Sequence, residues 1–183
     1  MKIIAGTHKG RDIRAAKGTR PTLAIVRKCV FDILQDMIEG ATVLDLFAGS
    51  GALGIEALSR GASSVVFVDR EKKALSCIKE NLISLKISPN DTQLLHAQAN
   101  NALQYFARKK VQFNVIFIDP PYAEIESSEQ LFTFIDTTLL LAPRGHLFIE
   151  APARSCLPIL QGMYLQFASV RKIGSTQLQE YIY

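Results

Sequence analysis

A polar corner follows an apolar run near the middle of this 183-residue sequence. The residues VIFI at 115–118 lead directly into Asp119, Pro120, Pro121 and Tyr122. Ordinary turns favour Gly, Asn, Ser and Asp, and the two prolines here instead fix the backbone and carry no N–H to compete for acceptors. The corner could therefore hold a flat ring by its amino group, with Asp119 and the Pro120 carbonyl as acceptors and Tyr122 stacked on the ring face.

A glycine-rich loop, DLFAGSGALG at residues 45–54, lies between an expected strand and an expected helix. Gly49, Gly51 and Gly54 match the spacing G-x-G-x-x-G, which lets the backbone approach a ligand closely in front of the free N–H groups of a helix. Asp69 ends the next apolar segment, where a carboxylate can accept hydrogen bonds from a ribose diol. The spacing predicts a cofactor that contains a nucleoside.

Two cofactor classes share these features, and Asp45 helps to separate them. A dinucleotide would place its pyrophosphate at the loop, whereas S-adenosylmethionine would place its ammonium and carboxylate there. A carboxylate in the first strand opposes a pyrophosphate and favours an ammonium, so Asp45 favours S-adenosylmethionine. With that cofactor, the corner at 119–122 would hold an amine in line with a transferable methyl group. Positioning and electrostatics would supply the catalysis, without a strong general base.

Apolar segments alternate with helical patterns from residue 41 onward, after a first helix at 22–40. We expect strands at 42–47, 63–69, 92–97, 114–119 and 145–151, and helices at 50–60, 72–85, 101–109, 128–141 and 154–160. Such alternation predicts an α/β, Rossmann-like fold whose seven-stranded, mostly parallel sheet is covered on both faces. The tail around Gly174 predicts an antiparallel hairpin. Ligands of such sheets bind at the carboxyl ends of the strands, where Asp45, Asp69, Asn101 and Asp119 all fall.

The first 28 residues carry an excess of positive charge. They hold eight Lys and Arg residues against one acid, Asp12, for a net charge of +7, so the rest of the chain carries −3 of the total of +4. Clustered cations bind polyanions because they release counterions from phosphates. We expect residues 1–21 to form a basic arm or hairpin beside a single catalytic domain at 22–183, with a nucleic acid as partner.

The composition is that of a globular protein, with 48% hydrophobic and 21% charged residues. No apolar run approaches the roughly 18 residues of a membrane span, and the sequence does not begin with a secretory signal. Cys29, Cys77 and Cys156 form no CxxC pair, which argues against a disulfide framework or a zinc site. We therefore expect a cytoplasmic monomer without a metal site or a membrane partner.

Three segments together resemble a known family. The motifs DLFAGSGALGIEALSRGA and DPPY, with the N-terminal pattern GTHKGR…RPT…VR, are similar to the bacterial small-subunit (16S) ribosomal RNA guanine-N2 methyltransferases, which are class I S-adenosylmethionine-dependent enzymes. The resemblance covers nearly the whole chain. It implies methyl transfer to the exocyclic N2 amine of a specific guanine. The implied partner is ribosomal RNA, which could be part of an assembling small subunit.

The resemblance also implies roles for particular residues. The target guanine would be held by Asp119, Pro120, Pro121 and Tyr122. The cofactor would be held by Asp45, Phe47, Gly49, Ser50, Gly51, Asp69, Arg70 and Asn101. The RNA would be contacted by Lys9, Arg11, Arg20, Pro21, Thr22 and Arg27. The family's arm commonly reads Arg-Gly-Arg and Arg-Pro-Thr-x-Asp-Arg-Val-Arg, so Lys9, Ala24 and Ile25 are departures from its pattern.

Other functions are compatible with parts of the sequence. DNA adenine-N6 and other amino methyltransferases share the DPPY motif, although a DNA enzyme would usually need an added target-recognition region. A NAD(P)-dependent oxidoreductase could use the glycine loop. A non-enzymatic RNA-binding module could use the basic arm, and the DPPY corner argues against it.

Overall fold

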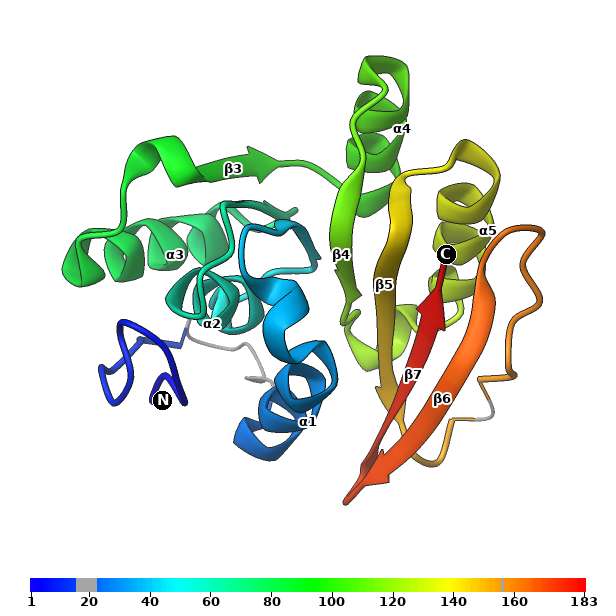
Figure 1. The fold of residues 1–183 in the computed structure, drawn as a ribbon, viewed down its shortest axis with the longest axis horizontal. Coiled ribbons are helices and arrows are strands. Elements are labelled where there is room, and N and C mark those ends of the chain that lie inside the picture. The colour runs from blue at the N-terminus through cyan, green and yellow to red at the C-terminus, as the bar shows by residue number, and fades with distance from the viewer. Residues whose placement is uncertain (16–22, 156) are drawn as a thin grey trace.

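A computed structural model describes residues 1–15, 23–155 and 157–183. Seven strands form one sheet in the order β3-β2-β1-β4-β5-β7-β6 (Figure 1). The strands are β1 (Thr42–Leu46), β2 (Ser64–Asp69), β3 (Thr92–His96), β4 (Phe113–Ile118), β5 (Leu141–Pro152), β6 (Gln166–Ile173) and β7 (Thr176–Ile182). Strands β1 to β5 are parallel, whereas β7 pairs antiparallel with β5 and with β6. The predicted Rossmann-like sheet with its terminal hairpin is confirmed.

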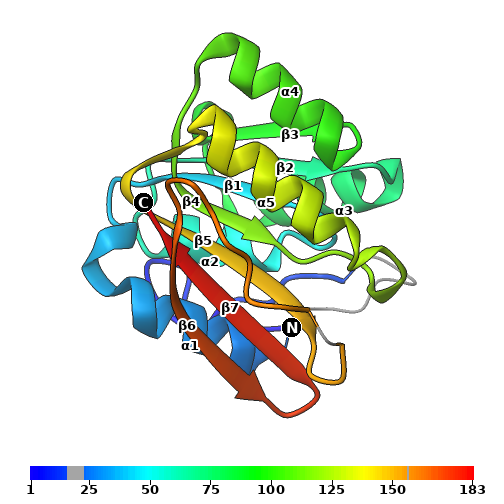
Figure 2. The same cartoon turned by 90° about the vertical axis from the view of Figure 1, so that its right-hand side faces the viewer.

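Helices cover both faces of the sheet (Figure 2). One face carries α1 (Ala24–Leu34), α2 (Ala52–Ser59) and α3 (Lys72–Leu85), and the other carries α4 (Ala99–Lys109) and α5 (Ser127–Thr138). Three short 3₁₀ turns are η1 (Gln35–Ile38), η2 (Pro89–Asp91) and η3 (Tyr122–Glu124). A separate apolar cluster fills the space on each side, because parallel strands buried on both faces present apolar side chains in both directions.

The prediction of a helix at 154–160 was wrong, because the described residues 157–160 contain no helix. Side chains of β7 hold the backbone there instead. The Leu160 N–H donates to the Tyr181 hydroxyl at 3.0 Å, and the Gln179 amide donates to the Leu157 and Pro158 carbonyls at 3.1 and 3.2 Å. A backbone satisfied by these contacts has no need of helical hydrogen bonds.

The described part of the arm, residues 1–15, folds back on itself and docks against α2 and α3 (Figure 1). Ile3 and Ile13 are each 2% exposed and join the same apolar cluster as α1 and α2. The arm is therefore anchored by apolar side chains that it contributes to the core, as well as by hydrogen bonds. Among the helices of the described ranges, none is long and apolar enough to cross a bilayer.

Candidate active site

The sheet order changes direction between β1 and β4, and the site is built at the carboxyl ends of these strands. The loop after β1 turns through left-handed backbone at Phe47, Gly49 and Gly51, with φ of 62°, 55° and 76°. Left-handed φ is unusual for a phenylalanine and is a conformation that occurs at functional sites. The turn brings the start of α2 against the strand ends, so free helix N–H groups face the same edge.

Gly54, the third glycine of the motif, has a packing role. A Cβ at this position would lie 2.3 Å from the Phe67 ring, so only glycine lets α2 approach β2 this closely. The Gly54 N–H also donates to Asp45 Oδ2 at 3.1 Å. Gly54 thus fixes the helix against the sheet and orients the carboxyl group of β1.

Asp69, the last residue of β2, holds the glycine loop in place. One carboxylate oxygen accepts from the Gly49 N–H and the other from the Glu71 N–H, each at 2.8 Å. A carboxylate oxygen has two lone pairs, so both can accept further hydrogen bonds. Asp69 can therefore support the loop and still receive the hydroxyl groups of a ribose.

Three carboxyl groups meet at this edge of the sheet. Asp45 is 2% exposed, and burial raises its pKa to about 8. The Gly54 N–H opposes this rise in pKa, while the negative charges of Asp119 and Asp69 add to it. The negative charges of Asp119 and Asp69 at this edge attract a cation. The site therefore suits a positively charged ligand and repels a pyrophosphate.

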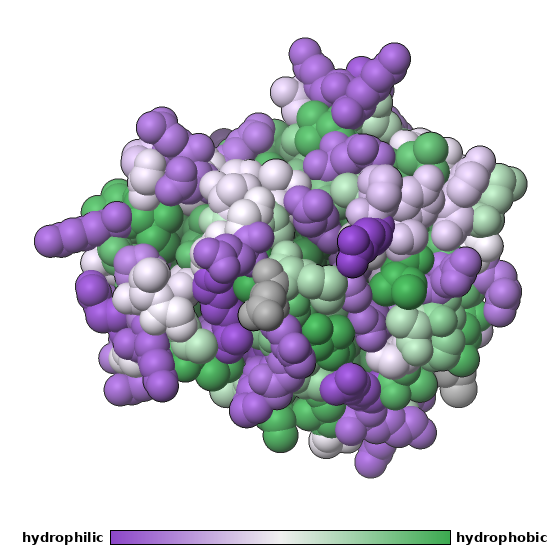
Figure 3. Space-filling model, viewed as in Figure 1, coloured by the Kyte–Doolittle hydropathy of each residue, from purple (hydrophilic) through white to green (hydrophobic). Residues whose placement is uncertain are grey.

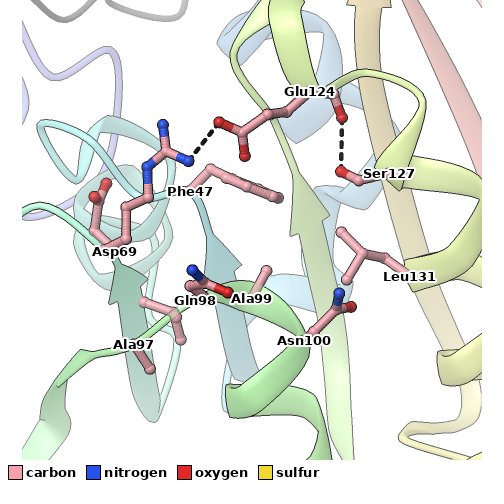
Figure 4. Close-up of a pocket in the computed structure, with 11 residues that line it drawn as sticks. Phe47, Asp69, Ala97, Gln98, Ala99, Asn100, Glu124, Ser127 and Leu131 are labelled. Atoms are coloured by element: carbon pink, nitrogen blue, oxygen red, sulfur yellow. Dashed lines mark hydrogen bonds and ion pairs between the residues drawn. The ribbon is translucent and has the colours of Figure 1, made fainter.

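A cavity of about 170 Å³ lies beside these carboxyl groups, between β2 and the first turns of α4 and α5. It is lined by Phe47, Val68, Asp69, Arg70, Ala97, Gln98, Ala99, Asn100, Glu124, Ser127 and Leu131. Figure 4 shows Glu124 and Ser127 on one side and Ala97 to Asn100 on the other. Arg70 Nη1 and Glu124 Oε1 are 2.6 Å apart, so an ion pair joins the end of β2 to the turn after β4. The mixture of apolar and amide side chains suits a flat heteroaromatic ring.

The structure brings Phe47, Asp69 and Arg70 together at this cavity, but it does not bring Asn101 there. The sequence pattern placed the start of a helix at Asn101, whereas α4 begins at Ala99, so Gln98 and Asn100 line the cavity instead. Sequence reasoning also missed Val68, Ala97, Ala99, Glu124, Ser127 and Leu131. The one signal available in the sequence was that Glu124 lies two residues after the DPPY motif, in the short turn η3 that begins at Tyr122.

The DPPY corner directly follows β4. Asp119 is partly buried, Pro120 is buried and Pro121 is exposed. The Pro121 carbonyl accepts from the Glu124 N–H at 2.8 Å, which starts η3 and holds the corner rigid. The charge of Asp119 acts on Asp45, so its carboxylate belongs to the same site. The side chain of Tyr122 lies outside the described part of the structure.

The residues predicted to contact RNA divide into three groups. Lys9 and Arg11 are exposed on the arm, and the surrounding face is largely hydrophilic (Figure 3). Arg20, Pro21 and Thr22 lie outside the described residues. The prediction that Arg27 contacts RNA was wrong. Arg27 is 1% exposed, and its guanidinium donates to the Lys2 carbonyl at 2.9 Å. Its position within α1 and beneath the arm gives it a structural role, with no surface to offer to RNA.

Comparison with known proteins fits this architecture. A family model described as conserved hypothetical protein 95 matches residues 1–182. The chain is 40% identical over 160 residues to the putative rRNA methyltransferase YlbH of Bacillus subtilis, covering 86% of each. It is 31% identical over 160 residues to the ribosomal RNA small subunit methyltransferase D of Escherichia coli, covering 86% of this chain and 78% of that protein.

Solved structures agree with this assignment. The putative methyltransferase yhhF from Escherichia coli matches with a TM-score of 0.82 and 28% identity, over 100% of this chain and 97% of that one. A putative methyltransferase complexed with SAH shares the fold, with a TM-score of 0.70 and 16% identity over 87% of this chain and 48% of that one. The chain therefore belongs to the conserved hypothetical protein 95 family, together with the rRNA small subunit methyltransferases D, and has the class I methyltransferase fold.

Proposed function

We propose that this S-adenosylmethionine-dependent rRNA methyltransferase transfers its methyl group to the exocyclic N2 amine of one guanine in small-subunit ribosomal RNA. The observation that carries the proposal is the meeting of Asp45, Asp69 and Asp119 around the glycine loop. One carboxyl group faces each part of the reaction: the cationic end of the cofactor, its ribose and the target amine. The family supplies the class of reaction, and the basic arm favours RNA as the substrate.

The residues of the site fit S-adenosylmethionine better than they fit a nicotinamide dinucleotide. Asp45 would face the ammonium group, Asp69 would accept from the ribose, and the amide side chains of Gln98 or Asn100 would contact the adenine edge. Burial is the main cause of the raised Asp45 pKa, and the neighbouring negative charges of Asp119 and Asp69 add to it. These charges favour an ammonium and a sulfonium over a pyrophosphate. When bound, this cofactor supplies an electrophilic methyl group.

The DPPY corner would prepare the guanine for the reaction. The N2 lone pair of guanine is delocalised into the ring, and it becomes available when both N–H bonds point at acceptors. Asp119 and the Pro120 carbonyl would be those acceptors, held rigid by the two prolines and by η3. As the new C–N bond forms, the methyl–sulfur bond would break and leave a neutral thioether. The nitrogen becomes cationic and strongly acidic, and its proton leaves to Asp119 or to water. Positioning therefore replaces a strong general base.

DPPY suits the amines of both guanine and adenine, so guanine is proposed from the family resemblance, and ribosomal RNA as the substrate is supported from outside the corner. Exposed Lys9 and Arg11 give the arm a positive surface, which favours contact with RNA phosphates. The similar protein from Escherichia coli is named as a small-subunit enzyme. A short arm has a small footprint, so we expect a partly or fully assembled small subunit to be a better substrate than naked RNA.

A labelled-methyl assay tests the proposal. The substrates are small subunits from a strain that lacks this chain, naked small-subunit RNA and DNA, followed by digestion to nucleosides. We expect the label in N2-methylguanosine from small-subunit RNA. Label in DNA adenine, or in another nucleoside of the RNA, would contradict the proposed target. Calorimetry with SAH and with NAD tests the cofactor, and we expect binding of SAH alone.

A further inference from the structure

Asn81 connects the arm to the cofactor loop through three hydrogen bonds. It lies on α3 and is 2% exposed. Its Oδ1 accepts from the Arg14 N–H at 2.8 Å, while its Nδ2 donates to the Arg14 carbonyl at 3.0 Å and to the Ser50 carbonyl at 3.2 Å. One buried amide thus holds both backbone groups of an arm residue and one backbone group of the glycine loop.

The Ser50 carbonyl is a sensitive point for cofactor binding. It shares a planar peptide unit with the Gly51 N–H, so its direction fixes that N–H, which donates to the Ala48 carbonyl at 2.7 Å. Gly51 is also the N-cap of α2, with left-handed φ of 76°. A rotation of this peptide would move the loop that the cofactor contacts. The hydrogen bond from Asn81 therefore restrains the conformation of the loop.

The arm end of the connection precedes, in the chain, the segment predicted to contact RNA. Arg14 is exposed at its side chain and fixed at its backbone, and it precedes Arg20, Pro21 and Thr22 in the chain by a few residues. RNA bound by the arm would hold Arg14, and through it the amide of Asn81. The arm also contacts α2, the helix that begins at the loop, because the Ile4 and Ala5 N–H groups donate to Glu56 and the His8 N–H donates to Ser59.

We infer that Asn81 is a positioning residue that couples RNA binding at the arm to cofactor binding at the glycine loop. The inference rests on the proposed RNA substrate. RNA that orders Arg14 fixes the Asn81 amide, which fixes the Ser50 peptide and raises the affinity for the cofactor. By thermodynamic reciprocity, the cofactor raises the affinity for RNA by the same factor. A complex that holds one ligand is thereby favoured to hold both.

The test measures SAH binding by equilibrium dialysis, with and without saturating small subunits from a strain that lacks this chain. Subunits are expected to tighten SAH binding about fivefold or more in the unsubstituted protein. In Asn81→Ala and Asn81→Asp the tightening falls below about twofold, since neither side chain can donate to the Ser50 carbonyl. Asp loses both donations of the amide but keeps the acceptor for the Arg14 N–H, so it removes the loop contact while it retains one arm contact.

Cys77→Ala is the matched control. Cys77 lies on the same helix, donates to the Arg14 carbonyl at 3.3 Å and accepts from the Asn81 amide at 3.9 Å, but it has no bond to the loop among the described contacts. This variant should keep the full tightening by subunits. Equal tightening in the two Asn81 variants and in Cys77→Ala would overturn the inference.

A measurement on the unsubstituted protein covers the case in which the variants fail to fold. Hydrogen exchange of the amides at 49–51 should slow when naked small-subunit RNA is added, and unchanged exchange in protein with bound RNA would overturn the inference. The methyl-transfer assay separates the two proposals. An absence of methylated guanine is a failure of the proposed function, whereas methylation with equal SAH affinity in both conditions is a failure of the coupling alone.

Discussion

Asp45→Asn is expected to make the protein more stable and to weaken its binding of the cofactor. Burial raises the pKa of Asp45 from 3.8 to about 8. Between these two pH values the folded protein holds a proton that the unfolded chain has released. The unfolded state therefore binds fewer protons, and the stability falls as the pH rises through this window.

The structure sets the size of the effect. Each pKa unit corresponds to about 1.4 kcal/mol, so the contribution of Asp45 to the unfolding free energy falls by about 4 kcal/mol, as an upper bound, between pH 5 and pH 8. An asparagine at this position has no proton to lose, and its side-chain oxygen can still accept from the Gly54 N–H. At pH 5 the unfolded parent has already released this proton, so the variant should already be the more stable protein. Its advantage in unfolding free energy should grow by up to that amount between pH 5 and pH 8.

Urea unfolding followed by circular dichroism at pH 5, 6, 7 and 8 measures the difference. Other titrating groups are common to both proteins, so they largely cancel when the two unfolding free energies are subtracted. A difference that stays constant over this range would refute a raised Asp45 pKa. In the same proteins, SAH binding should release up to one proton near pH 7 in the parent, because the ammonium favours the carboxylate, and should release none in the variant. Calorimetry in buffers of different ionisation enthalpy counts these protons.

Three further substitutions test other parts of the site and the arm. Asp119→Ala should lower methyl transfer by at least about 100-fold while SAH affinity stays within a few fold, because the target amine loses its acceptor; equal turnover would remove Asp119 from the mechanism. Glu124→Gln breaks the partly exposed ion pair with Arg70. SAH should then dissociate about two- to fivefold faster in stopped flow, and its dissociation rate should no longer depend on salt concentration. Gly6→Ala would put a Cβ 1.7 Å from the Ser59 carbonyl oxygen at φ of +80°, and should destabilise the fold by about 1–3 kcal/mol and expose the arm to limited proteolysis; parent-like resistance would show that the arm is not docked there.

The sequence predicted the sheet because its signals were redundant. Apolar strands, helical patterns and turn residues agreed over most of the chain, and the strand ends followed from the parallel arrangement. It failed where apolar residues suit two structures. The run LLL at 139–141 was assigned to a helix, yet α5 ends at Thr138 and Leu139 takes left-handed φ of 53° before β5 begins at Leu141. Periodicity alone cannot separate the end of a buried helix from the start of a buried strand.

The site was predictable where a residue type is tied to a backbone position, and less so where it depends on the direction of a side chain. Gly49, Gly51 and Asp69 belong to the first kind. The choice between Asn100 and Asn101 belongs to the second, because adjacent helical residues point about 100° apart and the start of α4 decides which one faces the cavity. Arg27 shows the same limit. Its charge suggested RNA, whereas its burial depends on how the arm packs over α1, which charge patterns do not reveal.

The way in which the arm is anchored leaves its positive charge available. Its backbone is held by buried or partly buried side chains, namely those of Glu56, Ser59 and Asn81. The Arg11 guanidinium donates at the surface, to the Ser84 carbonyl. The Arg14 side chain pairs with Glu80 at the surface, where both are more than 60% exposed. An exposed ion pair contributes only about 0–1 kcal/mol, so a phosphate can replace Glu80 at little cost. The arm can therefore exchange its surface partners for RNA, and RNA held there would further order the backbone that connects to the cofactor loop.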